Sequence, residues 1–167
     1  MLKAVSTLCL TTLLFSICLG QQANSTQGKV LFKANTEFSI QLDTPIFTDK
    51  NAVGDDVKFI LNEDVTGEGD KLPKGSTVFG RIVSVEKTSA KSETAKVCIM
   101  FDFVKKGEDF VSLVAAIISV DPNPDAIKFN ASPIFSDGTV LSLKGKEIQL
   151  DKGRMFRVKL TKDITAN

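Results

Sequence analysis

The chain contains no histidine, no tyrosine and no tryptophan among its 167 residues. Without histidine, neither a Ser-His-Asp triad nor a Cys-His pair can form, and a catalytic zinc ion would lack imidazole ligands. Glycan sites usually stack the sugar on tryptophan or tyrosine, whereas phenylalanine is the only aromatic residue here. We therefore expect a protein that is not an enzyme, with no catalytic residue, no cofactor and no bound metal.

Cysteine is also scarce. Two of the three cysteines, Cys9 and Cys18, lie within the first 20 residues, so Cys98 stands alone in the rest of the chain. One cysteine cannot close a disulfide, and the fold must therefore be stabilised by an ordinary hydrophobic core. Cys98 lies between two apolar residues with no base nearby in sequence, so we interpret it as a small strand residue rather than a nucleophile.

Residues 1–20 have the pattern of a secretory signal-peptide helix. Lys3 supplies the basic start, an apolar run follows, and Cys18 and Gly20 are the small residues before the expected cleavage point. The pattern predicts export to the bacterial periplasm or beyond, with no membrane span after cleavage. An uncleaved anchor and a lipidated Cys18 are the alternatives, and Ile17 fits lipidation poorly because a small residue is expected there.

The charge balance excludes two classes of partner. Loss of Lys3 with the signal peptide leaves equal numbers of basic and acidic residues. A nucleic-acid-binding protein carries a basic surface, and attraction to anionic lipid also needs excess positive charge. We therefore expect neither nucleic acid nor an anionic membrane surface as a partner.

Period-two alternation of apolar and polar residues predicts a β protein. After a polar lead-in at 21–35, the alternation recurs at 38–42, 57–61 and 97–103, and no segment has the pattern of a long amphipathic helix. We predict one all-β domain over 36–162: a single β-barrel or closed β-sandwich of about seven to nine mostly antiparallel strands, preceded by the signal-peptide helix.

Two segments depart from the alternating pattern. Residues 110–120 are apolar at both odd and even positions, which predicts a central strand covered on both faces, with a short buried helix as the alternative. Residues 121–137 contain three prolines, and we predict that they form the longest irregular segment.

A turn motif is repeated before three of the predicted strands. Its copies are Leu72-Pro73-Lys74-Gly75, Leu150-Asp151-Lys152-Gly153 and the looser Leu31-Phe32-Lys33-Ala34. The proline presets the turn, and Gly75 can adopt the left-handed conformation that a following strand requires. We interpret Lys74 and Lys152 as solvated charges rather than binding residues.

Carboxylates are the remaining candidates for chemistry. The sequence Asp43-Thr44-Pro45 differs from the Asp-Thr-Gly turn of aspartic proteases, because proline removes a backbone donor. A hydrolase that uses Asp43, Asp102 or Asp137 is therefore our third and weakest hypothesis.

Two acidic segments resemble calcium sites only in part. Residues 121–125 match the start of a calcium loop, but Ala126 and Ser132 replace the required glycine and glutamate. A second group of acids could hold calcium weakly, but an acidic hairpin tip explains it better: Glu63, Asp64, Glu68 and Asp70.

An ordered series of short motifs resembles one known family. The series is Phe38–Ile46, Val53-Gly54-Asp55, Glu63-Asp64-Val65, Leu72–Ser76 with Val78-Phe79-Gly80, and Phe101-Asp102. It resembles the periplasmic β-barrel domain of TrbI-type conjugation proteins, the scaffold of the type IV secretion outer core. The resemblance spans roughly residues 36–118, with a weaker echo at 139–160.

This resemblance implies a structural role, because barrels of that family pack side by side in a ring in the cell envelope. The present chain has a leader in place of their transmembrane helix, and 121–137 lacks their apolar helical pair. We expect a non-enzymatic, exported envelope protein that binds other envelope proteins or itself. The alternative is a periplasmic barrel with a phenylalanine-lined mouth that binds a small ligand, a lipid or a glycan.

Overall fold

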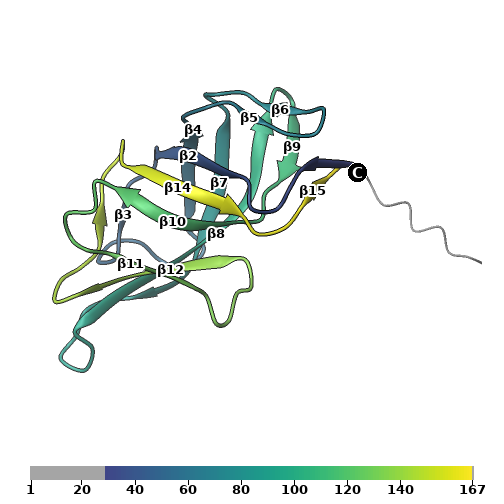
Figure 1. Cartoon of the computed structure of the whole chain (residues 1–167). Helices are drawn as coiled ribbons and strands as arrows, with labels where there is room; N and C mark the ends of the chain where they lie inside the picture. Colours follow the sequence, from purple (N-terminus) through teal and green to yellow (C-terminus); the bar gives the residue numbers. More distant parts are fainter. Residues whose placement is uncertain (1–28, 167) are drawn as a thin grey trace, which may run out of the picture.

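The computed structural model describes residues 29–166, which form strands and turns without any helix (Figure 1). The strands are β1 (Val30–Phe32), β2 (Glu37–Leu42), β3 (Ile46–Phe47), β4 (Asp56–Leu61), β5 (Val65–Thr66), β6 (Lys71–Leu72), β7 (Thr77–Glu86), β8 (Thr94–Lys106), β9 (Asp109–Ser112), β10 (Ala115–Asp121), β11 (Lys128–Ala131), β12 (Gly138–Lys144), β13 (Gln149–Leu150), β14 (Met155–Leu160) and β15 (Ile164–Thr165). The predicted signal-peptide helix and Cys18 lie outside the described residues.

Nine strands form one antiparallel sheet that curls into a barrel. The order is β10-β14-β2-β4-β7-β8-β12-β11, and β9 pairs with the far end of β8. The two ends of the sheet approach each other where the Ile117 amide donates a 2.9 Å hydrogen bond to the Thr139 hydroxyl. A side chain therefore joins β10 to β12 at the seam, and the barrel is nearly closed. The predicted all-β antiparallel barrel is confirmed.

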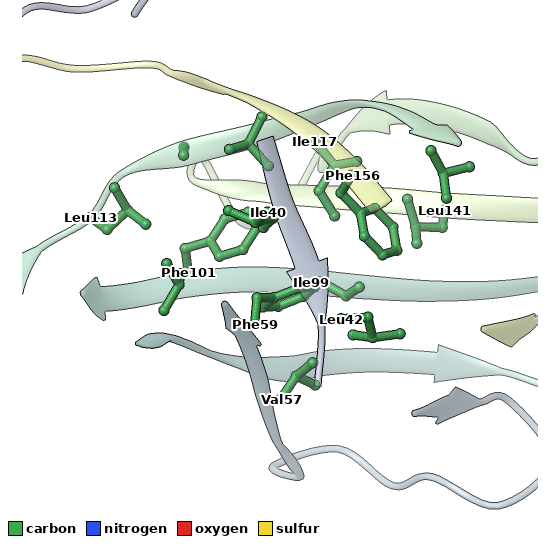
Figure 2. Packing of buried hydrophobic residues seen from close by; sticks show 14 of the residues in the cluster. Ile40, Leu42, Val57, Phe59, Ile99, Phe101, Leu113, Ile117, Leu141 and Phe156 are labelled. Carbon is green, nitrogen blue, oxygen red and sulfur yellow. The ribbon is translucent and has the colours of Figure 1, made fainter. Parts of the chain in front are cut away.

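Alternate residues of the central strands fill the barrel with apolar side chains (Figure 2). Phe59 lies at the centre, with its ring centroid 5.4 Å from that of Phe101 and 5.7 Å from that of Phe156. The predicted inward triplets of β2 and β4 are all buried: Phe38, Ile40, Leu42, Val57, Phe59 and Leu61. A dry, interdigitated core of this kind provides the stability that disulfides cannot provide in this chain.

The structure corrects two of the predicted segments. Residues 110–120 are not one central strand, because the chain bends at Leu113 and Val114 and separates β9 from β10. The Leu113 amide donates to the Asp102 carbonyl in β8, and the Val114 carbonyl accepts from the Thr161 amide just after β14, so the two residues bond to different segments. Residues 121–137 are not wholly irregular either, because β11 pairs with β12 there.

Six of the short strands pair at the rim as three two-stranded units, which we call clasps: β1–β15, β3–β13 and β5–β6. In each clasp one strand follows a barrel strand after a three-residue link. Leu42 leads to Ile46, Leu61 to Val65 and Leu160 to Ile164 in this way. The other strand of each clasp leads through a tight turn into the next barrel strand. The clasps therefore connect strands while they cover the barrel ends.

The repeated turn has the same backbone at all three places. Asn35, Gly75 and Gly153 have positive φ angles of 68°, 86° and 92°. Their amides donate to the last leucine of a neighbouring barrel strand: Asn35 to Leu160 (2.8 Å), Gly75 to Leu61 (2.8 Å) and Gly153 to Leu42 (2.7 Å). The third copy is therefore shifted by one residue from the predicted alignment, because Asn35 rather than Ala34 is the left-handed residue.

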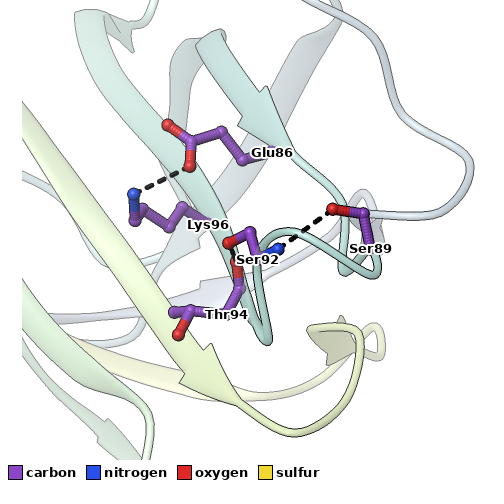
Figure 3. A network of polar contacts seen from close by, with 5 residues as sticks. All are labelled: Glu86, Ser89, Ser92, Thr94 and Lys96. Carbon is purple, nitrogen blue, oxygen red and sulfur yellow. Dashed lines mark hydrogen bonds and ion pairs between the residues drawn. The ribbon is translucent and has the colours of Figure 1, made fainter.

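The Ser/Thr/Lys-rich connector between β7 and β8 is a compact hairpin end (Figure 3). Ser89 and Ser92 exchange backbone hydrogen bonds, and the Ser89 hydroxyl accepts from the Ser92 amide at 3.1 Å. Lys96 forms a 2.7 Å ion pair with Glu86 across the two strands. These contacts hold the long β7–β8 ribbon together beyond the barrel.

Two strands of the fold lie beyond the predicted domain boundaries of 36 and 162. β1 falls in the predicted lead-in, where Phe32 is a fully buried core residue, and β15 follows residue 162. Over residues 29–166, no helix has the length and apolar character that crossing a membrane requires.

Candidate functional site

The three carboxylates considered for hydrolysis each have a separate cationic partner. Asp43 lies 2.6 Å from the ammonium of Lys152, and Asp102 lies 3.2 Å from the guanidinium of Arg81. Asp137 lies 3.0 Å from Lys162. A glycosidase uses two carboxylates with different roles at a set separation. The structure places these three in ion pairs instead.

The acidic cluster is likewise divided among separate partners. Asp64 pairs with Lys71 at 2.7 Å and accepts the Lys74 amide at 2.8 Å, and these hydrogen bonds hold its pKa below the ordinary value. Asp70 pairs with Lys106, and Glu68 pairs at 2.6 Å with a lysine before β2. Within residues 29–166, no group of three metal-binding side chains converges on one point.

The segment that resembles a calcium loop is occupied by its own contacts. The Asn123 side chain accepts the Ile127 amide at 2.9 Å and donates to the Ile127 carbonyl at 3.0 Å. Asp125 forms an ion pair with Lys146 on the way to β13. The asparagine therefore closes a local turn, and the aspartate attaches the segment to the barrel.

Cys98 is fully buried on the outer wall of the barrel. It lies beneath the turn that includes Ser132, and a side chain at Gly138 would collide with its sulfur at 2.9 Å. Burial raises the pKa of the thiol, against a smaller lowering by the Ser132 hydroxyl. A buried neutral thiol is a poor nucleophile. Its predicted role as a small strand residue agrees with this position.

A polar network at the β3–β13 clasp was not expected from the sequence. The Glu147 carboxylate accepts hydrogen bonds from the hydroxyls of Thr48 and Thr88 and from the Thr88 amide at 2.7 Å. The Thr48 hydroxyl in turn accepts the Ile148 amide at 2.9 Å. The two hydroxyls lower the pKa of Glu147 most. One carboxylate therefore joins three distant segments.

The β1–β15 clasp instead borders an open groove of about 520 Å³. One wall is β9 and the residues after it, and the other is β15. The lining residues are Leu31, Asp109, Phe110, Val111, Ser112, Val114, Asp163, Ile164, Thr165 and Ala166. This groove is bordered by strands that belong to two different sheets.

Phenylalanines form a strip on the outer wall next to that groove. The ring centroids of Phe79 and Phe103 are 4.8 Å apart, and those of Phe103 and Phe110 are 5.0 Å apart. The ammonium of Lys58 lies 5.8 Å from the Phe79 centroid, and Phe110 is 61% exposed. Phe110 is therefore exposed on the outer wall, whereas the predicted ligand-binding barrel would have its phenylalanines at the mouth.

A smaller hollow of about 260 Å³ lies over the outer wall near Cys98. Its lining includes Pro133, Ile134, Phe135 and Val140, and Ile134 is 81% exposed.

A repeated pattern in the sequence could have revealed the clasps. Each of β2, β4 and β14 ends in leucine, and an isoleucine or valine follows four residues later. In two of the three links, an aspartate directly precedes this isoleucine or valine. Its carboxylate caps the turn that follows the other strand of the same clasp. Asp64 accepts the Lys74 amide and Asp163 accepts the Ala34 amide, at 2.8 and 2.7 Å.

The fold and these surfaces define a nearly closed antiparallel β-barrel with extra short strands at its rim. No protein-family profile and no curated protein matches the sequence. Among solved structures, the chain is similar to ComB10 of the Com type IV secretion system of Helicobacter pylori. The TM-score is 0.51 at 13% identity, and the match covers 83% of this chain and 92% of that one. The two chains therefore share a fold.

Proposed function

We propose that this chain is an exported, non-enzymatic cell-envelope protein whose barrel is a structural and protein-interaction module of the TrbI-like kind. The observation that carries the proposal is the fold shared with ComB10, a component of a type IV secretion system. The match extends over most of both chains, so the whole barrel, rather than one motif, is alike.

The carboxylate geometry supports a role without catalysis. Asp43, Asp102 and Asp137 each form their own ion pair, and the Cys98 thiol is buried. Substituting any one of the three aspartates by asparagine should therefore leave association with partners intact. If purified protein showed a hydrolytic activity that one of these substitutions abolished, the non-enzymatic role would be refuted.

The direct test is the native size of the protein released from its own cell envelope by mild detergent. It should be run beside recombinant residues 21–167. We expect a large species in the envelope extract that the recombinant chain does not form alone, and mass spectrometry of that species identifies the partners. A single small species in both samples would contradict an assembly role.

The apolar hollow near Ile134 favours a second candidate function, the binding of a small ligand, lipid or glycan. Its volume of about 260 Å³ suits a small apolar group. Thermal unfolding with envelope lipids and glycans tests this function, because a ligand that binds only the folded state raises the melting temperature. Ile134→Ser should remove such a shift, whereas Val53→Ser, at another exposed apolar residue, should not.

A further inference from the structure

The groove beside the β1–β15 clasp lies between two strand edges that face each other. β9 pairs with β8 on one side, and β15 pairs with β1 on one side. On their other sides, neither strand is paired with any strand among residues 29–166, and both line the groove. Figure 1 places β9 and β15 on the same side of the barrel.

The backbone groups of these edges point into the groove. The Leu113 amide donates to the Asp102 carbonyl at 3.0 Å, which makes Ser112 and Phe103 a non-hydrogen-bonded pair of the β8–β9 ladder. In such a pair the N–H and C=O point away from the partner strand. The Ser112 backbone therefore faces the groove.

The same argument applies to the opposite wall. The Ala166 amide donates to the Lys29 carbonyl at 2.8 Å, so Thr165 and Val30 are the non-hydrogen-bonded pair of the β1–β15 ladder. The N–H and C=O of Thr165 consequently point away from β1 and toward the groove. Two backbone edges thus offer donors and acceptors to one space.

The side chains of the groove define the chemistry of a ligand. Leu31, Val114 and Ile164 supply apolar walls. Every charged side chain in the lining is a carboxylate, namely Asp109 or Asp163, and the lining contains no lysine or arginine. Electrostatic complementarity therefore favours a basic ligand with apolar groups over an acidic one.

We propose that the groove binds an extended peptide of another envelope protein, with alternating apolar and basic side chains, as an added strand between β9 and β15. This inference rests on the proposed interaction role and assigns it a surface. Backbone hydrogen bonds to Ser112 and Thr165 hold the peptide, and its alternate side chains meet the apolar walls and the carboxylates. Recognition by strand addition has this division between backbone affinity and side-chain specificity.

Two other occupants are less suited to the groove. Residues 21–28 precede β1, but their sequence Gln-Gln-Ala-Asn-Ser-Thr-Gln-Gly has no basic residue and only one apolar side chain. A second copy of the barrel would have to insert one of its own strand edges between β9 and β15, whereas a peptide brings a single extended segment. Both occupants are separate outcomes of the test.

The test selects a displayed library of random peptides on the purified protein. We expect the enriched peptides to alternate apolar residues with lysine or arginine. Ser112→Pro removes the backbone donor that faces the groove and should weaken their binding by about tenfold or more, since one lost hydrogen bond is worth about that factor. The matched control Ser112→Ala keeps the donor and should bind as the wild type does.

A second variant separates loss of binding from loss of folding. Asp109→Lys should shift the preference of the same library toward acidic peptides, which a damaged fold would not do. Proline is tolerated on the outer edge of a strand, so Ser112→Pro should keep the wild-type circular dichroism spectrum and urea midpoint. Acidic peptides from the wild type, equal binding to Ser112→Pro, or no enrichment would overturn the proposal.

Further measurements test the other occupants and separate this inference from the proposed function. Tighter peptide binding after deletion of residues 21–28 would assign the groove to that segment, and a dimer that Ser112→Pro dissolves would assign it to a second copy. Either outcome would overturn the proposal.

If the large envelope species persists with Ser112→Pro, the groove inference fails while the assembly role stands. If the wild type forms no such species, the assembly role itself fails.

Discussion

The β3–β13 and β1–β15 clasps have the same construction but different surroundings. In each, one strand follows a barrel strand after a three-residue link, and the other leads into a left-handed turn, at Gly153 and Asn35 respectively. At the first clasp, Glu147 joins the connector after β7 to the clasp through two threonines. At the second, Asp163 caps only its own turn, and β15 borders the 520 Å³ groove.

This difference shows that one repeated unit can be joined to a neighbouring segment in one place and border an open groove in another. The short strands contribute buried residues in both clasps, including Phe32, Ile46 and Leu150. What differs is the neighbouring segment: the β7–β8 connector bonds to one clasp through Thr88 and Glu147, whereas β9 and the other clasp border a groove. The two clasps therefore differ in what lies beside them at the rim, while both contribute side chains to one core.

The largest expected effect tests whether the open clasp belongs to the core. Phe32 is completely buried, so Phe32→Ala should lower the free energy of unfolding by about 3–5 kcal/mol. Urea denaturation measures this change in the free energy of unfolding. Phe110→Ala is the matched control on the other side of the groove and should cost under about 1 kcal/mol, because that ring is 61% exposed. Similar losses for the two variants would mean that the clasp is not part of the core.

The second prediction concerns the turn that all clasps share. Gly75 has a φ of 86° and nothing within 4 Å of an added Cβ. Gly75→Val should therefore cost about 1–3 kcal/mol through backbone strain alone. Lys74→Val at the exposed neighbouring position is the control and should change the urea midpoint little. If Gly75→Val had the same urea midpoint as the wild type, the left-handed conformation at Gly75 would be refuted.

The third prediction weakens the closed clasp at its carboxylate. Glu147→Gln replaces charge-assisted hydrogen bonds to Thr48 and Thr88 by neutral ones, which should cost about 1 kcal/mol. Glu93→Gln, at an exposed glutamate 3.6 Å from Lys144, should have no measurable effect. Equal midpoints for the two variants in urea would show that Glu147 does not hold the clasp closed.

The same carboxylate predicts a pH dependence. The pKa of Glu147 is lowered from 4.5 by the two threonine hydroxyls, so the unfolded chain takes up the proton first. The stabilisation is therefore complete above about pH 4.5 and is lost as the pH falls through the folded pKa. The difference in unfolding free energy between wild type and Glu147→Gln should be constant from neutral pH down to that point and then narrow. If this difference widened as the pH fell, the pKa of Glu147 would be raised in the folded state rather than lowered.

Local patterns predicted the barrel strands and turns, and long-range contacts determined the rest. Alternation identified the buried faces of β2 and β4, and Gly75 and Gly153 marked the turns before β7 and β14 because left-handed backbone favours glycine. The bend at Leu113 depends on partners in other strands, so an apolar run predicted one continuous strand. Glu147 bonds to Thr88, which is 59 positions away in the sequence, and to Thr48, which is 99 positions away. No local pattern indicates contacts of this range.

The smallest expected effect distinguishes the open clasp from the other two by its turn residue. Asn35 has a φ of 68° where the equivalent turns have glycine. Asn35→Gly relieves the mild strain of a side chain in that conformation, but it also gives the unfolded chain more freedom, an entropic cost of about 0.4–1 kcal/mol. The two effects oppose each other, so the urea midpoint should move by less than the equivalent of about 0.5 kcal/mol. Asn35→Val should destabilise as Gly75→Val does, because a β-branched residue has no such tolerance for positive φ. If Asn35→Val is also neutral, the turn before β2 is not held in the left-handed conformation, and the open clasp differs from the closed one in its backbone as well as in its groove.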